Sequence, residues 1–248
     1  MRPVIETPSP NFGPRKNGKR IEHLILHYTG MQSAFESLRR LQDKTAEVSA
    51  HYLVDEDGTI HRLVPEEMRA WHAGVSYWAG ETDINSTSIG IEIQNPGHEW
   101  GYRPFPQPQM QAVAELCRDI LDRNPHIRPY GVLGHSDIAP GRKADPGELF
   151  DWKYLASQKV GLWPEPNDVH YLDAEEILGN PDEVKNILTQ FGYNPALPLD
   201  LLISTFQSHY HPEIFELNKD QIGQVNAETI ARLIYIYRKR LELRPRVA

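Results

Sequence analysis

The sequence predicts a mixed α/β fold, with a β-sheet flanked by helices and a small three-helix bundle at the C-terminal end. Two observations support this prediction. Short apolar or alternating segments, typical of strands, are interleaved with helical patterns up to about residue 160, and beyond that point apolar residues recur at helical spacing only. We therefore expect an extended arm over residues 1–20, a main domain over 21–163, a linker over 164–178 and the bundle over 179–248.

The arm and the strands follow from local sequence. Prolines and glycines interrupt any regular period in residues 1–20. The segment IEHLILHYTG, residues 21–30, is the almost continuous apolar run of a strand that is buried on both faces. Residues 51–64 form a hairpin around Asp57 and Gly58. The strand SIGIEIQN places three isoleucines on one face and, on the other, Gly90, Glu92 and Gln94.

The helices are marked by the residues at which they begin. Ser33 and Glu36 form a capping box, and Pro108 stands in the first turn of a helix whose apolar stripe continues to Asn124. The bundle has three such starts, at Pro181, near Pro198 and after Asn226. A bundle of roughly sixty residues is near the lower size limit for an independently stable domain.

Composition excludes several classes of function. The 248 residues include 34 acidic and 26 basic side chains, a net charge of −8, so nucleic acid is not an expected partner. The single cysteine, Cys117, cannot form an internal disulfide and lies in the apolar stripe of a predicted helix. No segment has the apolar length of a signal peptide or a membrane span, which favours a cytoplasmic location, with the periplasm or cell envelope as the alternative. We expect a monomer.

Two histidines and an aspartate stand where a metal site could form. His27 lies at the end of the first buried strand, His135 ends a later strand, and Asp145 follows after a loop rich in proline and glycine. Open α/β sheets bind ligands at the carboxyl ends of their strands. Two histidines and one carboxylate are also a known zinc set, which leaves the fourth position for water. The spacing alone leaves a second interpretation open, in which these histidines are hydrogen-bonded packing residues.

Glu92 and Lys143 extend this candidate site. A carboxylate between two isoleucines of a strand is costly unless it faces a polar cleft, and Gly90 would keep that cleft open. Lys143 could supply a positive charge to a developing oxyanion. Each residue also has a plainer interpretation. Glu92 could lie on a solvated strand face or in a salt bridge, and Lys143 could be a surface lysine.

Several segments together carry a resemblance to a known family. They are, in chain order, LHYTG around His27, VSAHYLVDEDGTIHRLVPE, RAWHAGVSYWAG, NSTSIGIEIQN and GHSDIAPGRKADPG. Over roughly residues 20–155 the chain resembles the zinc N-acetylmuramoyl-L-alanine amidases of the amidase_2 superfamily, specifically the AmpD and AmiD branch. One such segment would be weak evidence, but their shared order makes the match specific.

The resemblance implies a metal site and two catalytic groups. It places His27, His135 and Asp145 on the positions that hold Zn²⁺, the one cofactor it implies. Glu92 falls on the catalytic glutamate, which takes a proton from the attacking water and returns it to the departing amine. Lys143 falls on the lysine that polarises the scissile carbonyl.

The same resemblance assigns the contacts to the substrate. Arg69 is expected to hold the carboxylate of the stem peptide as an arginine fork. Tyr28, Trp71, His72 and Asn85 are expected at the substrate groove, although Trp71 could also pack beneath it, and His72 also suits a role in orientation and hydrogen bonding. Tyr28 stands where cytosolic members often have asparagine, directly after the first ligand.

These expectations define a function and its alternatives. We expect an amidase that cuts peptidoglycan between the lactyl group of N-acetylmuramic or anhydromuramic acid and the L-alanine of the stem peptide. The tail resembles a three-helix peptidoglycan-binding module, with a purely structural helical cap as the alternative. A non-catalytic peptidoglycan-recognition protein and a zinc peptidase acting on the stem peptide are the competing functions. The sequence leaves open whether the substrate is intact peptidoglycan or a soluble anhydro-muropeptide.

Overall fold

The computed structural model describes residues 3–244, and its centre is a six-stranded sheet with the order β1-β5-β4-β7-β3-β8. In this sheet β4 and β5 are antiparallel, and the other neighbouring strands are parallel. A second, two-stranded sheet pairs β2 with β6. The strands are β1 (Val4–Glu6), β2 (Phe12–Pro14), β3 (His23–Tyr28), β4 (Tyr52–Val54), β5 (Ile60–Arg62), β6 (Met68–Ala70), β7 (Ser88–Ile93) and β8 (Val132–Gly134).

Helices are interleaved with these strands and then continue alone, so the predicted fold class is confirmed. The α-helices of residues 3–244 are α1 (Ala34–Gln42), α2 (Ile84–Thr87), α3 (Gly97–Trp100), α4 (Gln107–Arg123), α5 (His135–Ile138), α6 (Trp152–Ser157), α7 (Asp168–Ile177), α8 (Pro181–Phe191), α9 (Leu199–Tyr210), α10 (Ile214–Leu217) and α11 (Ala227–Leu243). Ser33 and Asn226 both act as N-caps, since Ser33 accepts the backbone N–H of Glu36 at 3.3 Å and Asn226 accepts that of Thr229 at 2.9 Å. Within this described part of the chain, no helix combines the length and the apolar character needed to cross a membrane.

The N-terminal arm has the expected extended conformation, but it is paired into the fold. β1 lies parallel to β5, and β2 lies antiparallel to β6. Arg15 then reaches into the main domain, where its guanidinium donates to the backbone carbonyls of Glu66 at 2.7 Å and Ser86 at 3.0 Å. The pairing was not predicted, because the partners of an edge strand lie far along the chain and leave no mark in the local pattern of prolines and glycines.

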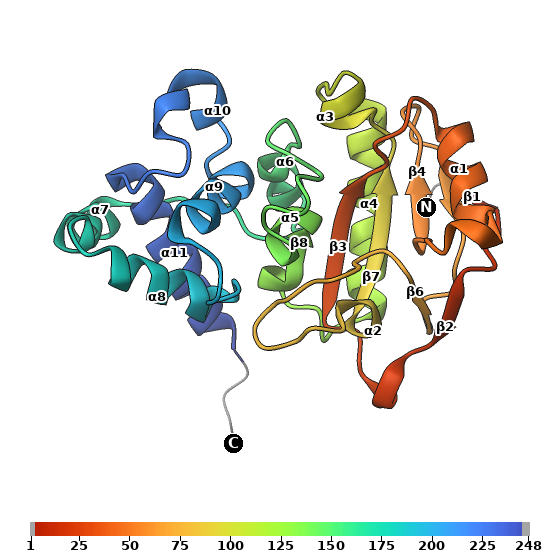
Figure 1. Cartoon of the computed structure of the whole chain (residues 1–248), viewed down its shortest axis with the longest axis horizontal. Helices are drawn as coiled ribbons and strands as arrows, with labels where there is room; N and C mark the ends of the chain where they lie inside the picture. The colour runs from red at the N-terminus through yellow and green to blue at the C-terminus, as the bar shows by residue number, and fades with distance from the viewer. Residues whose placement is uncertain (1–2, 245–248) are drawn as a thin grey trace.

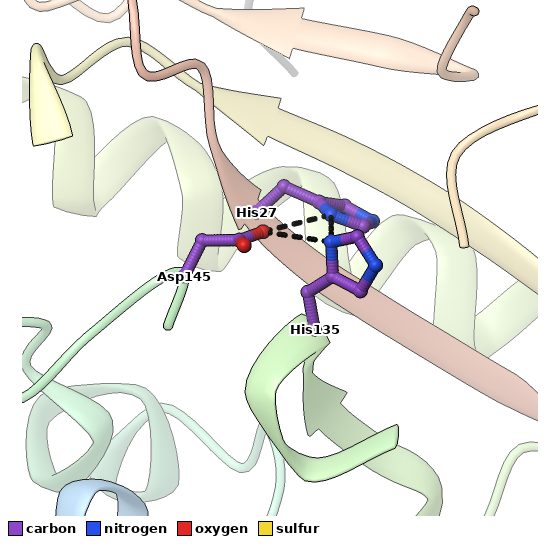
Figure 2. A group of neighbouring side chains, drawn as sticks. All are labelled: His27, His135 and Asp145. Atoms are coloured by element: carbon purple, nitrogen blue, oxygen red, sulfur yellow. Dashed lines mark hydrogen bonds and ion pairs between the residues drawn. The ribbon is translucent and has the colours of Figure 1, made fainter. Parts of the chain in front are cut away.

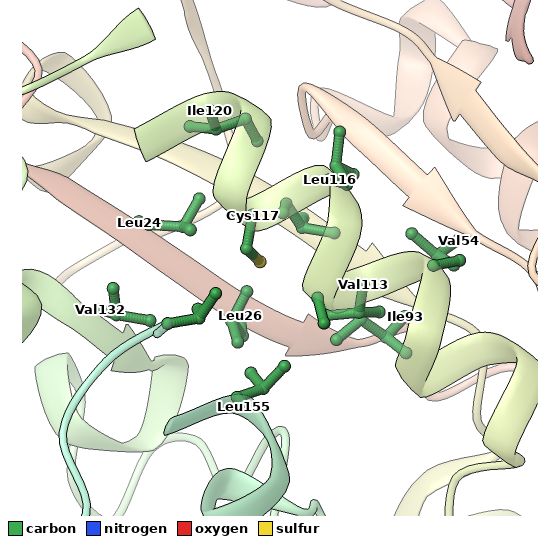
Figure 3. Packing of buried hydrophobic residues seen from close by; sticks show 14 of the residues in the cluster. Leu24, Leu26, Val54, Ile93, Val113, Leu116, Cys117, Ile120, Val132 and Leu155 are labelled. Atoms are coloured by element: carbon green, nitrogen blue, oxygen red, sulfur yellow. The ribbon is translucent and has the colours of Figure 1, made fainter. Parts of the chain in front are cut away.

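One face of the large sheet is closed by α4. The isoleucines of β7, which the sequence places on one face, are fully buried there together with Leu24 and Leu26 of β3. Figure 3 shows this packing against the apolar stripe of α4, which includes Val113, Leu116 and Cys117. Burying an aliphatic side chain of this size stabilises the fold by about 1.5–3 kcal/mol. Cys117 is therefore a packing residue, as expected.

The opposite face of the sheet is polar at one end of its strands and apolar further back. Toward the carboxyl ends it is polar, and His27 of β3 stands directly opposite Glu92 of β7. Further back, Ile25 and Leu133 are fully buried in a cluster that also contains Trp78 and the apolar residues of the C-terminal helices. Figure 1 shows α7 to α11 grouped at one end of the molecule, beside α5 and β8. The bundle thus shares a hydrophobic core with the main domain.

A helix occupies much of the segment that was expected to be a linker. Residues 164–178 contain α7, which begins after Asn167 and lies along α11. Tyr171 of α7 donates its hydroxyl to Glu228 of α11 at 2.7 Å. Ala174 is the only fully buried residue of α7. The helix therefore lacks the apolar stripe by which helices are predicted from sequence. Pro164 and Pro166, which are typical of a linker, lie before its first residue.

Candidate metal centre and active site

Three side chains meet where β3 and β8 end (Figure 2). His27 belongs to β3, His135 is the first residue of α5 directly after β8, and Asp145 lies in the loop that follows α5. The distance from His27 Nδ1 to His135 Nδ1 is 2.9 Å, and Asp145 Oδ2 lies 3.0 Å from each of these nitrogens. All three side chains are buried, with 1%, 3% and 5% of their residues' surface exposed. The structure thus brings together the three residues that the sequence predicts.

This triangle has the dimensions of a tetrahedral metal site. Zinc binds histidine nitrogen and carboxylate oxygen at about 2.0–2.2 Å, which places neighbouring ligand atoms roughly 3.3 Å apart. The separations of 2.9–3.0 Å require only a small expansion to reach this value. Among the residues that the structure describes, this is the group of histidine and acidic side chains that could hold a metal ion. The trio therefore fits zinc with one coordination position left over.

A chain of hydrogen bonds determines which nitrogen of His27 faces the triangle. Ser88 Oγ donates to the backbone carbonyl of Ile84 at 2.6 Å, so it accepts from His72 Nε2 at 3.1 Å. His72 Nδ1 is then an acceptor for the Nε2–H of His27 at 3.0 Å. The lone pair of His27 Nδ1 is left directed at the triangle, as metal binding requires. His72 thus orients the imidazole of His27, a candidate metal ligand.

Gly90 and Asn85 determine where His72 and the backbone of Ala73 lie. A Cβ atom on Gly90 would lie 2.5 Å from Cγ of His72, so a glycine is required there. Asn85 Oδ1 accepts the backbone N–H groups of His72 at 3.0 Å and Ala73 at 2.8 Å. The carbonyl of Ala73 in turn lies 3.0 Å from His135 Nε2. Because His135 donates from Nε2, its Nδ1 is also left for the metal.

Burial and neighbouring charges set the protonation states. Desolvation, with the adjacent His135, lowers the pKa of His27 to about 4, so this imidazole is neutral at pH 7. Burial opposes ionisation of Asp145, but the two imidazoles hold its pKa well below the usual range. Both groups are therefore in the form that binds a metal. Desolvation, and then the charge of Asp145, raise the pKa of Glu92 well above its usual value, and Glu92 Oε2 is buried without a hydrogen-bond partner.

The metal trio lines a cavity of about 550 Å³. Five of the residues predicted for catalysis or substrate binding also line it, namely Tyr28, Trp71, His72, Glu92 and Lys143. The walls come from α1 and α3, from the loops that follow β3 and β6 and precede β4, and from the loop that carries Asp145. The Glu92 carboxyl group, the Lys143 ammonium group and the candidate metal trio therefore surround one volume.

Two predicted substrate contacts lie outside this lining. Arg69 donates its Nε–H and one NH2 group to Asp83 Oδ1 at 3.2 and 2.8 Å, and it does not line the cavity. Asn85 is occupied by the backbone of the loop that presents His72, and it does not line the cavity either. The expectation for both residues came from the family pattern, which does not reveal the local partners of a side chain. Arg69 is ion-paired and Asn85 is hydrogen-bonded to the backbone, and a substrate contact of either residue stays a prediction.

The cavity also contains two arginines that the sequence did not single out. Arg40 of α1 and Arg142 both line it. Arg142 donates to the backbone carbonyls of Ala73 at 2.6 Å and Val75 at 2.9 Å, which fixes it beside the metal trio. Arg142 stands next to Lys143 in a segment that carries the family resemblance, so it could have been found. Arg40 lies on the polar side of an amphipathic helix, where the pattern predicts only solvent.

These features fit a hydrolase with a candidate metal site, because the buried trio of His27, His135 and Asp145 adjoins a carboxyl group with a raised pKa. The family model of N-acetylmuramoyl-L-alanine amidase, Amidase_2, matches residues 17–148. The chain belongs to this family, and it is an amidase of the AmpD and AmiD branch, as its sequence predicts. N-acetylmuramoyl-L-alanine amidase AmiD of Escherichia coli is 38% identical over 231 residues, which span 85% of this chain and 82% of that protein.

Other relatives agree with this assignment. The 1,6-anhydro-N-acetylmuramyl-L-alanine amidase AmpD of Haemophilus influenzae is 35% identical over 61% of this chain and 90% of its own length. Among solved structures, a substrate complex of AmiD from Escherichia coli has a TM-score of 0.75 at 35% identity and covers 92% of this chain and 90% of its own. AmpDh3 of Pseudomonas aeruginosa has a TM-score of 0.77 at 34% identity, with coverages of 90% and 94%.

Proposed function

We propose that this amidase depends on zinc and hydrolyses the bond between the lactyl group of N-acetylmuramic or anhydromuramic acid and L-alanine. The observation that supports it is the buried triangle of His27, His135 and Asp145. Each imidazole has its second nitrogen bonded within the protein, so the free lone pairs point to one place. A complete ligand set, with Glu92 and Lys143 present, also argues against a peptidoglycan-recognition protein without catalytic activity.

The chain's own residues would then carry the proton transfers. When bound, zinc lowers the pKa of water and polarises the scissile carbonyl. Glu92 accepts a proton from the attacking water and delivers it to the departing alanine amine. The raised pKa of Glu92 suits both steps, because its protonated form is stable enough to act as a donor. Lys143 lines the same cavity and places a positive charge near the developing oxyanion.

Relatives with bound ligands support a substrate class. The AmiD structure holds anhydro-N-acetylmuramic acid-L-Ala-D-γ-Glu-L-Lys, and an AmpDh3 structure holds anhydromuramic pentapeptide. We propose peptides of this class as substrates of the present chain. Arg40 would then receive a stem-peptide carboxylate in place of Arg69, because it lines the cavity and Arg69 does not. The guanidinium of Arg142, by comparison, is already held by two backbone carbonyls.

A polymeric substrate would extend into a second cleft, of about 890 Å³, between the main domain and the segment around α10. Trp163 and Phe215 line this cleft and are partly exposed, which offers flat apolar surfaces to sugar rings. Glu148 of the cleft lies 3.3 Å from His98, which lines the catalytic cavity, so the two spaces adjoin. We propose that the tail contributes to peptidoglycan binding at this cleft, because residues of the segment around α10 line it.

Product analysis tests the proposed reaction. Soluble anhydro-muropeptide and polymeric sacculus are digested in parallel and analysed by mass spectrometry. The proposed amidase releases a stem peptide that begins with L-alanine, whereas a zinc peptidase acting within the stem leaves alanine on the sugar. Zinc content is measured by atomic absorption, and His135→Ala should lose zinc and activity together. Cleavage within the stem, or full activity without zinc, would contradict the proposal.

A further inference from the structure

We infer that the helical bundle holds the metal-binding turn in position through Asp137 and is therefore part of the catalytic unit. This inference rests on the proposed metal site at His135. Asp137 belongs to the same single turn, α5, as His135, and only 1% of its surface is exposed. A carboxylate buried this deeply is costly unless hydrogen-bond donors surround it.

Asp137 receives three donors. The backbone N–H of Gly134 donates to Oδ2 at 2.7 Å and closes the turn on which His135 stands. The other two donors belong to the bundle, since the hydroxyl of Tyr193 reaches Oδ1 and the Nδ1–H of His209 reaches Oδ2, each at 2.7 Å. The bundle thus supplies two of the three bonds that make this buried carboxylate tolerable.

The turn that Asp137 anchors determines the position of two metal ligands. His135 is its first residue. The next residue, Ser136, donates its backbone N–H to the backbone carbonyl of Asp145 at 2.9 Å. A displacement of the turn would therefore move both His135 and Asp145 relative to His27 on β3, and it would open the ligand triangle.

The bundle presents its two donors rigidly. The ring of His209 is stacked between Trp152 of α6 and Tyr210, with centroid distances of 3.7 and 3.8 Å. Tyr193 is fully buried and meets Trp78 edge-on at 5.0 Å. A module that served only as a tether would need no buried polar contact with the catalytic turn. Groups that support metal ligands from outside the coordination sphere typically change metal affinity or activity by about 10–100-fold when removed.

Two substitutions of His209 separate its hydrogen bond from its stacking. His209→Phe keeps an aromatic ring between Trp152 and Tyr210 but removes the donor. His209→Asn loses the ring but retains an amide N–H near the position of Nδ1. We expect His209→Phe to weaken zinc binding by about tenfold, and the double variant with Tyr193→Phe to weaken it further. His209→Asn should stay close to the unmodified protein in zinc affinity, even if its melting temperature falls.

Tyr171→Phe is the matched control. Tyr171 also donates its hydroxyl to a carboxylate at 2.7 Å, that of Glu228, but this bond lies within the bundle. Zinc affinity is measured on the full chain by competition with a chelator of known affinity, at a temperature at which circular dichroism shows every variant folded. Excess zinc should restore much of the turnover of His209→Phe, because Glu92 and Lys143 are untouched.

The outcomes separate this inference from the metal site on which it rests. Equal zinc affinity in His209→Phe and Tyr171→Phe would overturn the inference. An equal loss in His209→Phe and His209→Asn would also overturn it, because the stacked ring would then be the essential feature. If the unmodified protein does not bind zinc, or if His135→Ala leaves its zinc affinity unchanged, the proposed metal site fails instead.

Discussion

Replacing Glu92 by glutamine should separate proton transfer from metal binding. Glu92 stands opposite His27 on the neighbouring strand, but it is not one of the three clustered ligands. Glutamine keeps the size of the side chain and loses its ability to take up a proton. We therefore expect Glu92→Gln to retain zinc and to lose turnover.

The function and the burial of the Glu92 carboxyl group determine how much turnover and stability should change. A general base contributes about 10²- to 10⁴-fold to the rate, so turnover should fall by at least about a hundredfold. Stability should change in the opposite direction, because the buried Glu92 carboxylate is desolvated and has no partner for Oε2, whereas glutamine carries no charge to desolvate. Relief of about 1 kcal/mol would raise the melting temperature by roughly 2–4 °C in a chain of this size.

The stability gain should depend on pH. Burial raises the pKa of Glu92 in the folded protein above its value in the unfolded chain. The folded state therefore binds the proton more tightly, and the carboxyl destabilises the fold increasingly as pH rises above the unfolded-state pKa. Glu92→Gln removes this dependence, so its gain in melting temperature should be larger at pH 8 than at pH 5.

Three measurements on the same preparations check the prediction. They are zinc content by atomic absorption, turnover of a soluble anhydro-muropeptide, and thermal unfolding at both pH values. His135→Ala is the contrasting variant, which should lose zinc and turnover together. A Glu92→Gln protein that retains zinc and nearly full turnover would refute the role assigned to Glu92. The proton transfer would then have to be carried out by another group, such as Lys143.

Further predictions concern the cavity walls and the tail. Lys143→Met should lower kcat by about 10²-fold, with zinc content unchanged. Arg40→Gln should raise KM for peptides with free carboxylates more than for their amidated forms, and equal changes on both would contradict its role. Trp163→Ala should reduce cleavage of sacculus in digests where soluble muropeptide is cleaved normally. Deleting residues 168–248 should abolish cleavage of both substrates, measured by mass spectrometry. A truncated chain that is soluble and active on the small substrate would show that the bundle is only a tether.

The local part of the fold could be predicted from sequence. The alternation of isoleucines with Gly90 and Glu92 identifies β7 and its two faces, and Asn226 marks the start of α11. Strand order and the pairing of the N-terminal arm could not be predicted, because they depend on contacts between distant segments. Helix α7 was missed because its contacts with α11 include polar bonds such as that of Tyr171, whereas the pattern that predicts helices is an apolar stripe.

The candidate site, too, could be predicted from the sequence only in part. Spacing alone left His27 and His135 open to a packing role, and the family resemblance was needed to select them. That resemblance could not show that Asp83 already engages the guanidinium of Arg69. It also could not reveal the bond between Asp137 and His209, which are 72 residues apart in the chain. Contacts of this kind depend on how two packed units meet.

The proposed dependence of catalysis on the bundle can be traced to one strand and one turn of the main domain. In the present chain Ile25 and His27 lie on the same face of β3, because side chains two apart share a face. The bundle buries Ile25 and Leu133 completely on that face. Removing it would expose both, at about 1.5–3 kcal/mol for each, and would leave Asp137 without two of its donors. One strand and one turn therefore serve the metal site and the bundle interface at once, and this shared use is the physical reason to treat the two parts as a single catalytic unit.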